Sequence, residues 1–545
     1  MIAPIRYNLI AVMQIRILMD KKFLISVGLS LATVWAFQYF WYKPTPGSSE
    51  VSVNGEQVIP KPGEVVKVAS REGLLKPLKT GFLFDAATAE QAKEVLIDTS
   101  QRAAIVSSRG GGLAQLNFKS YKGKDKKPLS TISNDAVVKS TPALTLMFDD
   151  AAPLDYEVVE SDEKDLRKTV LQAKYQGWLV TKEFSISEVN YKVDVTMRFE
   201  PLTAGVAPIY PRLFVPAPVV PELGEEQPTA FLFNENRNEV EKKSAGEELG
   251  DKTWYWASPC ALIGLQNKYF VHALVGDQQQ FVQRAYFHRI DAGKTEQVIL
   301  EGPEILDKTE WKLSFYMGPK VYDELVRVDE RLGSVAASGW FAWIIKLMLK
   351  FLDFVSKYVS NLGLAIIVLA VLLKLPLTPL TIYSSIKMER YQKHAPIISR
   401  IRAKYRSDTQ IQLQEVTKYH QEHNISPSTP LIGCLPMLIQ LPVMYALLDI
   451  LNNYIQLYQA PFFGWIVDLS AKDPFYIIPI LMGVSMLWQQ AMAPVSDEKQ
   501  RVLMFFVSIV MTVVFAGLPV GLVLYWLINN LLTIIENYVR RWFFA

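Results

Sequence analysis

Long apolar runs alternate with polar segments at both ends of this chain. The first run, residues 23–41, follows two lysines and ends in bulky aromatic residues. A cleavable signal peptide has an apolar region of about 7–15 residues and a small-residue cleavage site. The longer run therefore predicts an uncleaved signal-anchor helix with its basic end in the cytoplasm. We expect the anchor within residues 1–42, starting at Met1 or Met19, and a Pro/Gly/Ser-rich linker at 43–57.

The next region changes to short stretches in which apolar and polar residues alternate. Examples are residues 181–187, 191–199, 269–275 and 311–316, with turn residues between them. Many short strands without regularly interleaved helices predict an antiparallel β-sandwich. We assign this domain to residues 58–337, and its place after a signal anchor predicts that it is periplasmic.

A helical pattern follows at residues 338–360. Its polar residues recur at spacings of four, three and four, at Lys346, Lys350, Asp353 and Lys357. That spacing puts them on one face of an amphipathic helix. An ordinary core helix would show the same pattern, but this one leads into a long apolar run. We therefore favour a helix that lies in the membrane interface.

The remaining residues, 361–545, contain five apolar segments that predict membrane spans. They lie at 362–380, 431–451, 474–492, 502–515 and 518–539. A bilayer needs about 20 apolar residues, so the last two are separate spans, joined by a turn that contains Gly517 and Pro519. The expected fold is thus six transmembrane α-helices, an N-terminal anchor plus a five-helix core, with a large periplasmic antiparallel β-sandwich.

Basic residues between the second and third spans give the orientation. The loop at 383–430 is expected to form a cytoplasmic helical hairpin. It carries the basic cluster Lys387, Arg390, Lys393, Arg400, Arg402, Lys404 and Arg406. Because positive charge stays on the cytoplasmic side, this loop and both termini should be cytoplasmic. The chain is predicted to be a multi-pass protein of a bacterial inner membrane.

Composition excludes several other classes of protein. The net charge of +3 is too small to indicate nucleic-acid binding, and half of the residues are hydrophobic. Cys260 and Cys434 fall on different sides of the membrane in this topology, so no disulfide is expected. His420 and His423 lack further ligands nearby, which favours a solvated helix face over a metal site. With no phosphate-binding, nucleophile or zinc motif, we expect no cofactor, no metal and no catalytic residue.

Four of the core spans carry a polar residue near the middle of the membrane. These residues are Lys374, Gln440, Thr512 and the pair Asn529 and Asn530. Lys374 is about 18 Å from the outer end of its span at 1.5 Å per residue. A charge at that depth costs at least ~2.5–3.5 kcal/mol, so a shared, hydrated polar cavity is expected. The alternatives are snorkelling of Lys374 and interhelical hydrogen bonds without function for the amides.

Several motifs of the core resemble the YidC membrane protein insertases of Gram-negative bacteria. They include 433–442 (GCLPMLIQLP), 460–462 (APF), 468–470 (DLS), 473–477 (DPFYI) and 519–526 (PVGLVLYW). The resemblance covers nearly the whole chain, including the order of anchor, β domain, interfacial helix and five spans. It implies insertion of inner-membrane proteins from the cytoplasm through a hydrophilic intramembrane groove.

The resemblance also assigns roles to residues. The groove would include Lys374, where the family usually has Arg, so the charge is kept but the guanidinium fork is lost. Tyr525 and Trp526 match the family's groove aromatic position. The implied partners are nascent inner-membrane proteins, the Sec translocon, the ribosome and signal recognition machinery, and membrane lipids.

A mechanism follows as a hypothesis. The basic loop recruits a substrate hairpin through Arg390, Arg400, Arg402, Lys404 and Arg406. The polar layer replaces part of the hydration of the translocated segment, and burial of the substrate's apolar segment in lipid drives insertion. A channel or secondary transporter is the main alternative. A membrane-anchored periplasmic enzyme or sugar-binding protein is a third interpretation.

Overall fold

The computed structural model describes residues 92–544 with short gaps. The gaps are 124, 133–141, 149–152, 162–166, 221–227, 235–238, 245–253, 258–261, 291–294, 338–340, 360, 426–428 and 493–497. The predicted signal anchor, the linker, the alternative start at Met19 and Cys260 lie outside the described residues.

The N-terminal part of the described chain is built from three β-sheets. The four-stranded sheet has the order β1 (Glu94–Asp98), β2 (Arg102–Ser107), β3 (Gly112–Lys122) and β4 (Pro128–Ser130). The five-stranded sheet has the order β13 (Trp254–Ala257), β16 (Arg284–Ile290), β17 (Thr295–Glu301), β10 (Pro211–Pro216) and β5 (Thr145–Phe148). The nine-stranded sheet has the order β12 (Glu239–Ser244), β11 (Thr229–Asn234), β14 (Ile263–Gln266), β15 (Phe270–Asp277), β18 (Thr309–Pro319), β9 (Lys192–Pro201), β8 (Trp178–Ile186), β7 (Lys168–Tyr175) and β6 (Glu157–Ser161).

Every strand pair within the described residues is antiparallel, which confirms the predicted pairing. The alternation seen in the sequence has a direct counterpart in β9. Its Val193, Val195 and Met197 are fully buried, and the residues between them are partly exposed. Successive side chains of a strand point to opposite faces of the sheet, so β9 packs one face on the core and shows the other to solvent.

The five-stranded sheet is buried on both faces. In β10, Leu213 and Val215 belong to the main hydrophobic core. Phe214, between them, lies in a second cluster with Met147 and Ile299. Neighbouring residues of one strand therefore meet two different cores, which explains why β10 is apolar throughout rather than alternating.

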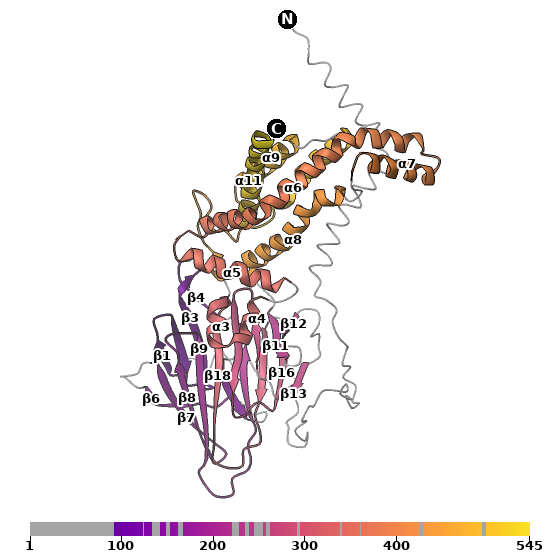
Figure 1. Ribbon diagram of the computed structural model, residues 1–545. Coiled ribbons are helices and arrows are strands. Elements are labelled where there is room, and N and C mark those ends of the chain that lie inside the picture. The colour runs from indigo at the N-terminus through magenta and orange to yellow at the C-terminus, as the bar shows by residue number, and fades with distance from the viewer. Residues whose placement is uncertain are drawn as a thin grey trace. The chain divides into compact units, whose positions relative to one another are not determined.

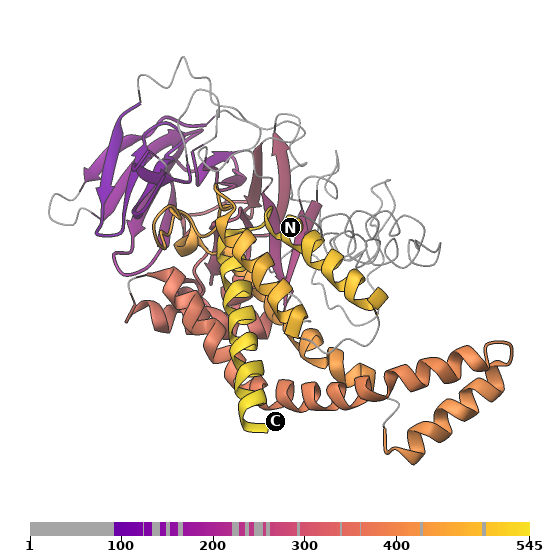
Figure 2. The same ribbon diagram turned by 90° about the horizontal axis from the view of Figure 1, so that it is seen from above.

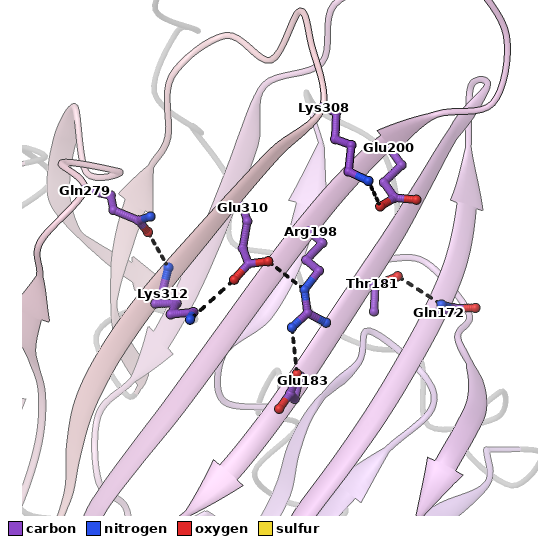
Figure 3. A network of polar contacts seen from close by, with 9 residues as sticks. All are labelled: Gln172, Thr181, Glu183, Arg198, Glu200, Gln279, Lys308, Glu310 and Lys312. Atoms are coloured by element: carbon purple, nitrogen blue, oxygen red, sulfur yellow. Dashed lines mark hydrogen bonds and ion pairs between the residues drawn. The ribbon is translucent and has the colours of Figure 1, made fainter.

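The solvent face of the nine-stranded sheet carries cross-strand charge pairs (Figure 3). Arg198 of β9 lies directly opposite Glu310 of β18, to which its Nε donates at 2.8 Å. The same guanidinium donates to Glu183 of β8 at 3.0 Å. Such exposed pairs contribute about 0–1 kcal/mol each, and they support the strand register on this face.

The C-terminal part is helical. Three short elements, α3 (Tyr322–Val328), η5 (Glu330–Leu332) and α4 (Gly333–Ala336), follow the last strand. The longer helices and one further short turn are α5 (Ala342–Ser356), α6 (Leu362–Lys404), α7 (Thr409–Glu422), α8 (Thr429–Asn453), η6 (Ile455–Leu457), α9 (Ile477–Met492), α10 (Glu498–Phe515) and α11 (Val520–Phe544).

Helix α6 joins a predicted span and a predicted loop in one continuous element. It has 43 residues, which at 1.5 Å per residue is about 65 Å, or twice the thickness of the hydrocarbon core. The Asn361 side chain caps its N-terminus by accepting from Gly363 N and Leu364 N. After a short turn, the side chain of Asp408 caps α7 in the same way. Helix α7 then runs back beside the second half of α6 (Figures 1 and 2).

Helix α5 is amphipathic, but its polar face differs from the one inferred from spacing. Trp343 and Phe354 are exposed while Met348 and Leu352 are buried. Asp353 was expected beside the lysines on the polar face, and that assignment is wrong because its side chain is buried. The hydroxyl of Tyr454 donates a hydrogen bond to the Asp353 carboxylate, which gives this polar group a partner inside the packing.

Among the described helices, two are long and apolar enough to cross a membrane. They are Leu362–Lys404 and Val520–Trp542. The helices at Ile477–Met492 and Arg501–Phe515 are apolar but shorter. The apolar helices of the core are therefore present, and the count of six spans stays a prediction.

Candidate functional site

One face of α11 collects the polar residues of the candidate site. Tyr525, Asn529, Thr533 and Glu536 follow one another at spacings of four, four and three residues. Positions three and four apart lie on the same side of a helix. Polar side chains of α6 and α8 contact this polar face of α11.

Lys374 of α6 is bound by two residues of this face. Its Nζ lies 3.2 Å from Glu536 Oε2 and donates to Thr533 Oγ1 at 2.9 Å. The Lys374 and Glu536 side chains are only 13% and 10% exposed. The hydroxyl of Thr381, seven residues after Lys374 on α6, donates a hydrogen bond to the other carboxylate oxygen of Glu536. The predicted buried cation is therefore one half of an interhelical ion pair.

Gln440 of α8 contacts the same face of α11 nearer to its N-terminus, at Tyr525. Its Nε2 donates to the Tyr525 hydroxyl at 2.5 Å. Tyr525 is 1% exposed, so this hydrogen bond satisfies a phenol that burial has removed from water. Two of the predicted site residues, one from α8 and one from α11, are thus in direct contact.

The two asparagines point to different neighbours. Asn529 lies on the polar face of α11, whereas Asn530 is turned toward α9, where its Nδ2 donates to Ser485 Oγ at 2.9 Å. Gln489 of α9 donates to the Asn530 carbonyl oxygen at 2.8 Å. Trp526 also lies away from Lys374, and its ring packs on Phe515 with a centroid distance of 5.0 Å.

Thr512 has no hydrogen bond to the Lys374 group in the described structure. Its hydroxyl donates to Ser508 O of its own helix at 2.8 Å. Its side chain fills the space beside Gly483, where an added Cβ would lie 2.4 Å from Thr512 Oγ1. Thr512 thus permits close packing of α9 on α10, and the predicted layer divides into a Lys374–α11 group and an α9–α10 group.

The five residues predicted to recruit substrate lie together on the α6–α7 hairpin. All are exposed, and in the described part of the chain none of them forms an ion pair; they are Arg390, Arg400, Arg402, Lys404 and Arg406. Glu389 instead pairs with Arg540 of α11 at 2.6 Å. The basic surface is therefore available to an acidic partner.

Two histidines of this hairpin, His420 and His423, lie in different surroundings. His420 is buried, and burial together with Arg402 lowers its pKa. His423 uses Nδ1 in a contact with Tyr419 O at 3.0 Å. Among the described residues no group of three His, Cys, Asp or Glu side chains is placed to hold a metal ion.

Glu536 is the residue that sequence reasoning missed. It is the only acidic residue of α11, and an ionisable group inside an apolar segment is itself a signal of function. Glu536 lies about 24 Å from the N-terminal end of α11, and Lys374 lies about 18 Å from the N-terminal end of α6. Long side chains can bridge that difference in depth, so comparing the depths of opposite charges would have identified the pair.

Comparisons with known proteins cover both parts of the chain. The family described as 60Kd inner membrane protein matches residues 354–544, and the YidC periplasmic domain matches residues 94–351. A protein named membrane protein insertase YidC from Geobacter metallireducens is 31% identical over 96% of this chain and 98% of its own length. One of the same name from Syntrophus aciditrophicus is 29% identical over 95% and 99%. A crystal structure described as active YidC insertase has 18% identity and a TM-score of 0.37, with 82% of this chain and 92% of that chain covered.

Proposed function

The chain belongs to the YidC family of membrane protein insertases, and we propose that its substrates enter the membrane at the polar layer around Lys374. It is an insertase rather than an enzyme, and its substrates are membrane proteins. It is an inner-membrane protein with a periplasmic, β-rich domain. The alternative of a channel or secondary transporter finds no support among these relatives.

The proposed topology has six spans, with the anchor at 1–42, the linker at 43–57 and the β domain at 58–337. An interfacial helix at 338–360 leads into the five-helix core at 361–545, whose hairpin loop is 383–430. Both termini are cytoplasmic in this proposal. It is supported by the exposed basic residues on the second half of α6, since positive charge marks the cytoplasmic side.

The main support for the proposed site is a lysine in the apolar part of one helix that is bound by polar residues of a second helix. Lys374 reaches Thr533 and Glu536 across the α6–α11 contact. Gln440 and Tyr525 extend the polar contact toward α8. An ion pair at this depth contributes little to stability over well-packed apolar residues, so its presence favours a functional role.

In the proposed mechanism, the hairpin of α6 and α7 first attracts a substrate through its exposed basic residues. These are Arg390, Arg400, Arg402, Lys404 and Arg406. The polar segment of the substrate that must cross then passes along a hydrophilic groove at the Lys374 layer. There Lys374, Gln440, Tyr525 and Asn529 replace part of the water that the segment loses. Thr512, Trp526 and Asn530 pack toward α9 and α10 and support the helices behind this layer. Transfer of the neighbouring apolar segment into lipid provides about 25 cal/mol per Å² of buried apolar area.

The proposal includes partners beyond the inserted proteins themselves. The Sec translocon would hand over spans of larger substrates, and the ribosome with the signal recognition machinery would deliver nascent chains to the basic hairpin. Membrane lipids surround the apolar helices. No cofactor, metal or nucleic acid takes part.

The test is reconstitution of the full chain in liposomes with a small two-span substrate whose translocated segment is acidic. Insertion is measured by protection from added protease, for the wild type and for Lys374→Arg, Lys374→Ala and Lys374→Glu. The Arg variant should keep most activity, because the charge is kept, and the Glu variant should lose most of it. Full activity of the Glu variant would show that Lys374 does not act on the substrate electrostatically.

A further inference from the structure

Two ion pairs connect α6 with α11, and each uses the single acidic residue of one helix. Glu389, the only acidic residue of α6, pairs with Arg540 at 2.6 Å. Glu536, the only acidic residue of α11, pairs with Lys374 at 3.2 Å. The first pair lies among the basic residues of the hairpin side. The second lies inside the apolar part of both helices, at the site proposed to receive substrate.

The resting site is therefore occupied by a carboxylate of the protein itself. The ammonium group of Lys374 donates a hydrogen bond to Thr533 Oγ1, and its Nζ forms an ion pair with Glu536 Oε2 at 3.2 Å. The Thr381 hydroxyl holds the second oxygen of Glu536 on α6. An acidic group of a substrate meets Lys374 in the same way as Glu536 does, because both are carboxylates that approach the same ammonium.

We propose that Glu536 is a specificity-determining residue, a competing counter-ion that an incoming segment must displace from Lys374. The inference rests on the proposed function of the Lys374 layer and adds to it. With Glu536 in place the layer is neutral overall, so an uncharged segment meets no unpaired cation. An acidic segment gains from Lys374 only to the extent that it replaces Glu536, which limits the preference for acidic segments.

The size of the effect follows from the fraction of Lys374 that is free. When a binding-competent state has a population of about one tenth, its apparent affinity is about tenfold weaker than that of the fully competent protein. Replacing the Glu536 carboxylate by an amide removes the competing charge but keeps an acceptor for Thr381. For a free fraction of about one tenth, the preference for acidic over neutral segments rises on the order of tenfold in this variant.

The experiment uses the full chain in liposomes and a two-span substrate with Asp, Asn or Lys at one central position of the translocated segment. The readout is the ratio of initial insertion rates for the Asp and Asn substrates, measured by protease protection. Glu536→Gln should raise this ratio. The separate variant Glu536→Asp keeps the charge and should show the wild-type ratio. Lys374→Gln with Glu536→Gln should abolish the preference, because Glu536 acts through Lys374.

Glu389→Gln is the matched control. It removes one carboxylate from an α6–α11 ion pair without touching Lys374, and it should leave the ratio unchanged. An unchanged ratio in Glu536→Gln, or an equal fall for all three substrates, would overturn the inference and leave Glu536 with a structural role only. Failure of the proposed function is distinguishable, because the wild type itself would then insert Asp and Lys substrates at equal rates.

Discussion

Removing one member of the Lys374–Glu536 pair should destabilise the helical core more than removing both. At 3.2 Å, two unit charges attract with about 5 kcal/mol at an effective dielectric constant of 20. The lost hydration of the two groups offsets much of this attraction. Breaking a buried pair by removing one partner is costly, whereas replacing both partners is often nearly neutral. We expect about 2 kcal/mol of destabilisation for Lys374→Met or Glu536→Gln alone and about 1 kcal/mol for the double variant.

The assay is a double-mutant cycle on the purified chain, unfolded by SDS in mixed micelles and followed by tryptophan fluorescence. The expected coupling free energy between Lys374 and Glu536 is about 3 kcal/mol. The more exposed pair Glu389 and Arg540, with side chains 37% and 12% exposed, serves as comparison and should show a coupling below about 1 kcal/mol. Additive effects of the Lys374 and Glu536 changes, within about 0.5 kcal/mol, would refute the assignment of a coupled pair.

Two further predictions concern packing and pH. Gly483→Ala should destabilise the core by about 1–3 kcal/mol through overpacking, since its Cβ would lie 2.4 Å from Thr512 Oγ1. Adding Thr512→Ala should recover most of the lost stability in the same SDS assay, and a double variant as unstable as Gly483→Ala would contradict the packing role. Burial raises the pKa of the Asp353 carboxyl, a hydrogen-bond partner of Tyr454, from 3.8 to about 6. The folded state therefore binds a proton that the unfolded chain has released, so the stabilising contribution of Asp353 is present near pH 4 and falls by about 3 kcal/mol as the pH rises through 6. The difference in Tm between Asp353→Asn and wild type should grow over that range, and parallel curves would contradict the prediction.

Periodicity predicts the parts of this fold in which one face of an element is buried. The alternation at 191–199 corresponds to β9, whose inward residues are buried. Where both faces are covered, as for Phe214 and its neighbours in β10, alternation disappears, and the sequence shows an apolar run without indicating two cores. Antiparallel pairing was predictable, whereas the division into three sheets depends on long-range pairing that local patterns do not encode.

Depth along the predicted spans identified polar residues near the middle of the membrane but not their partners. Asn529 and Asn530 are adjacent, so their side chains are about 100° apart on the helix and meet different neighbours. Thr512 has the expected depth, but its orientation sends it toward Gly483. Depth along single spans does not indicate Glu536, because its contact with Lys374 depends on how α6 and α11 pack.

For Asp353, too, the sequence pattern does not indicate the residue that it contacts. Helical spacing placed it with the lysines of α5, yet a hydrogen bond from Tyr454, about a hundred residues away in the sequence, keeps it buried. A polar residue at the edge of a helical face can lie on either side of that edge, and the partner that decides its position is not visible in the local pattern.

Site-specific photocrosslinking tests the central claim most directly, namely that the translocated segment passes the Lys374 layer. A photoreactive residue is placed at Asn529, on the polar face of α11, or at Val513 of α10, which is 71% exposed. A stalled acidic substrate is then added to liposomes that contain each variant. The account predicts that the polar segment of the substrate crosslinks to position 529 and not to position 513. Crosslinks of that segment at 513 alone would contradict it.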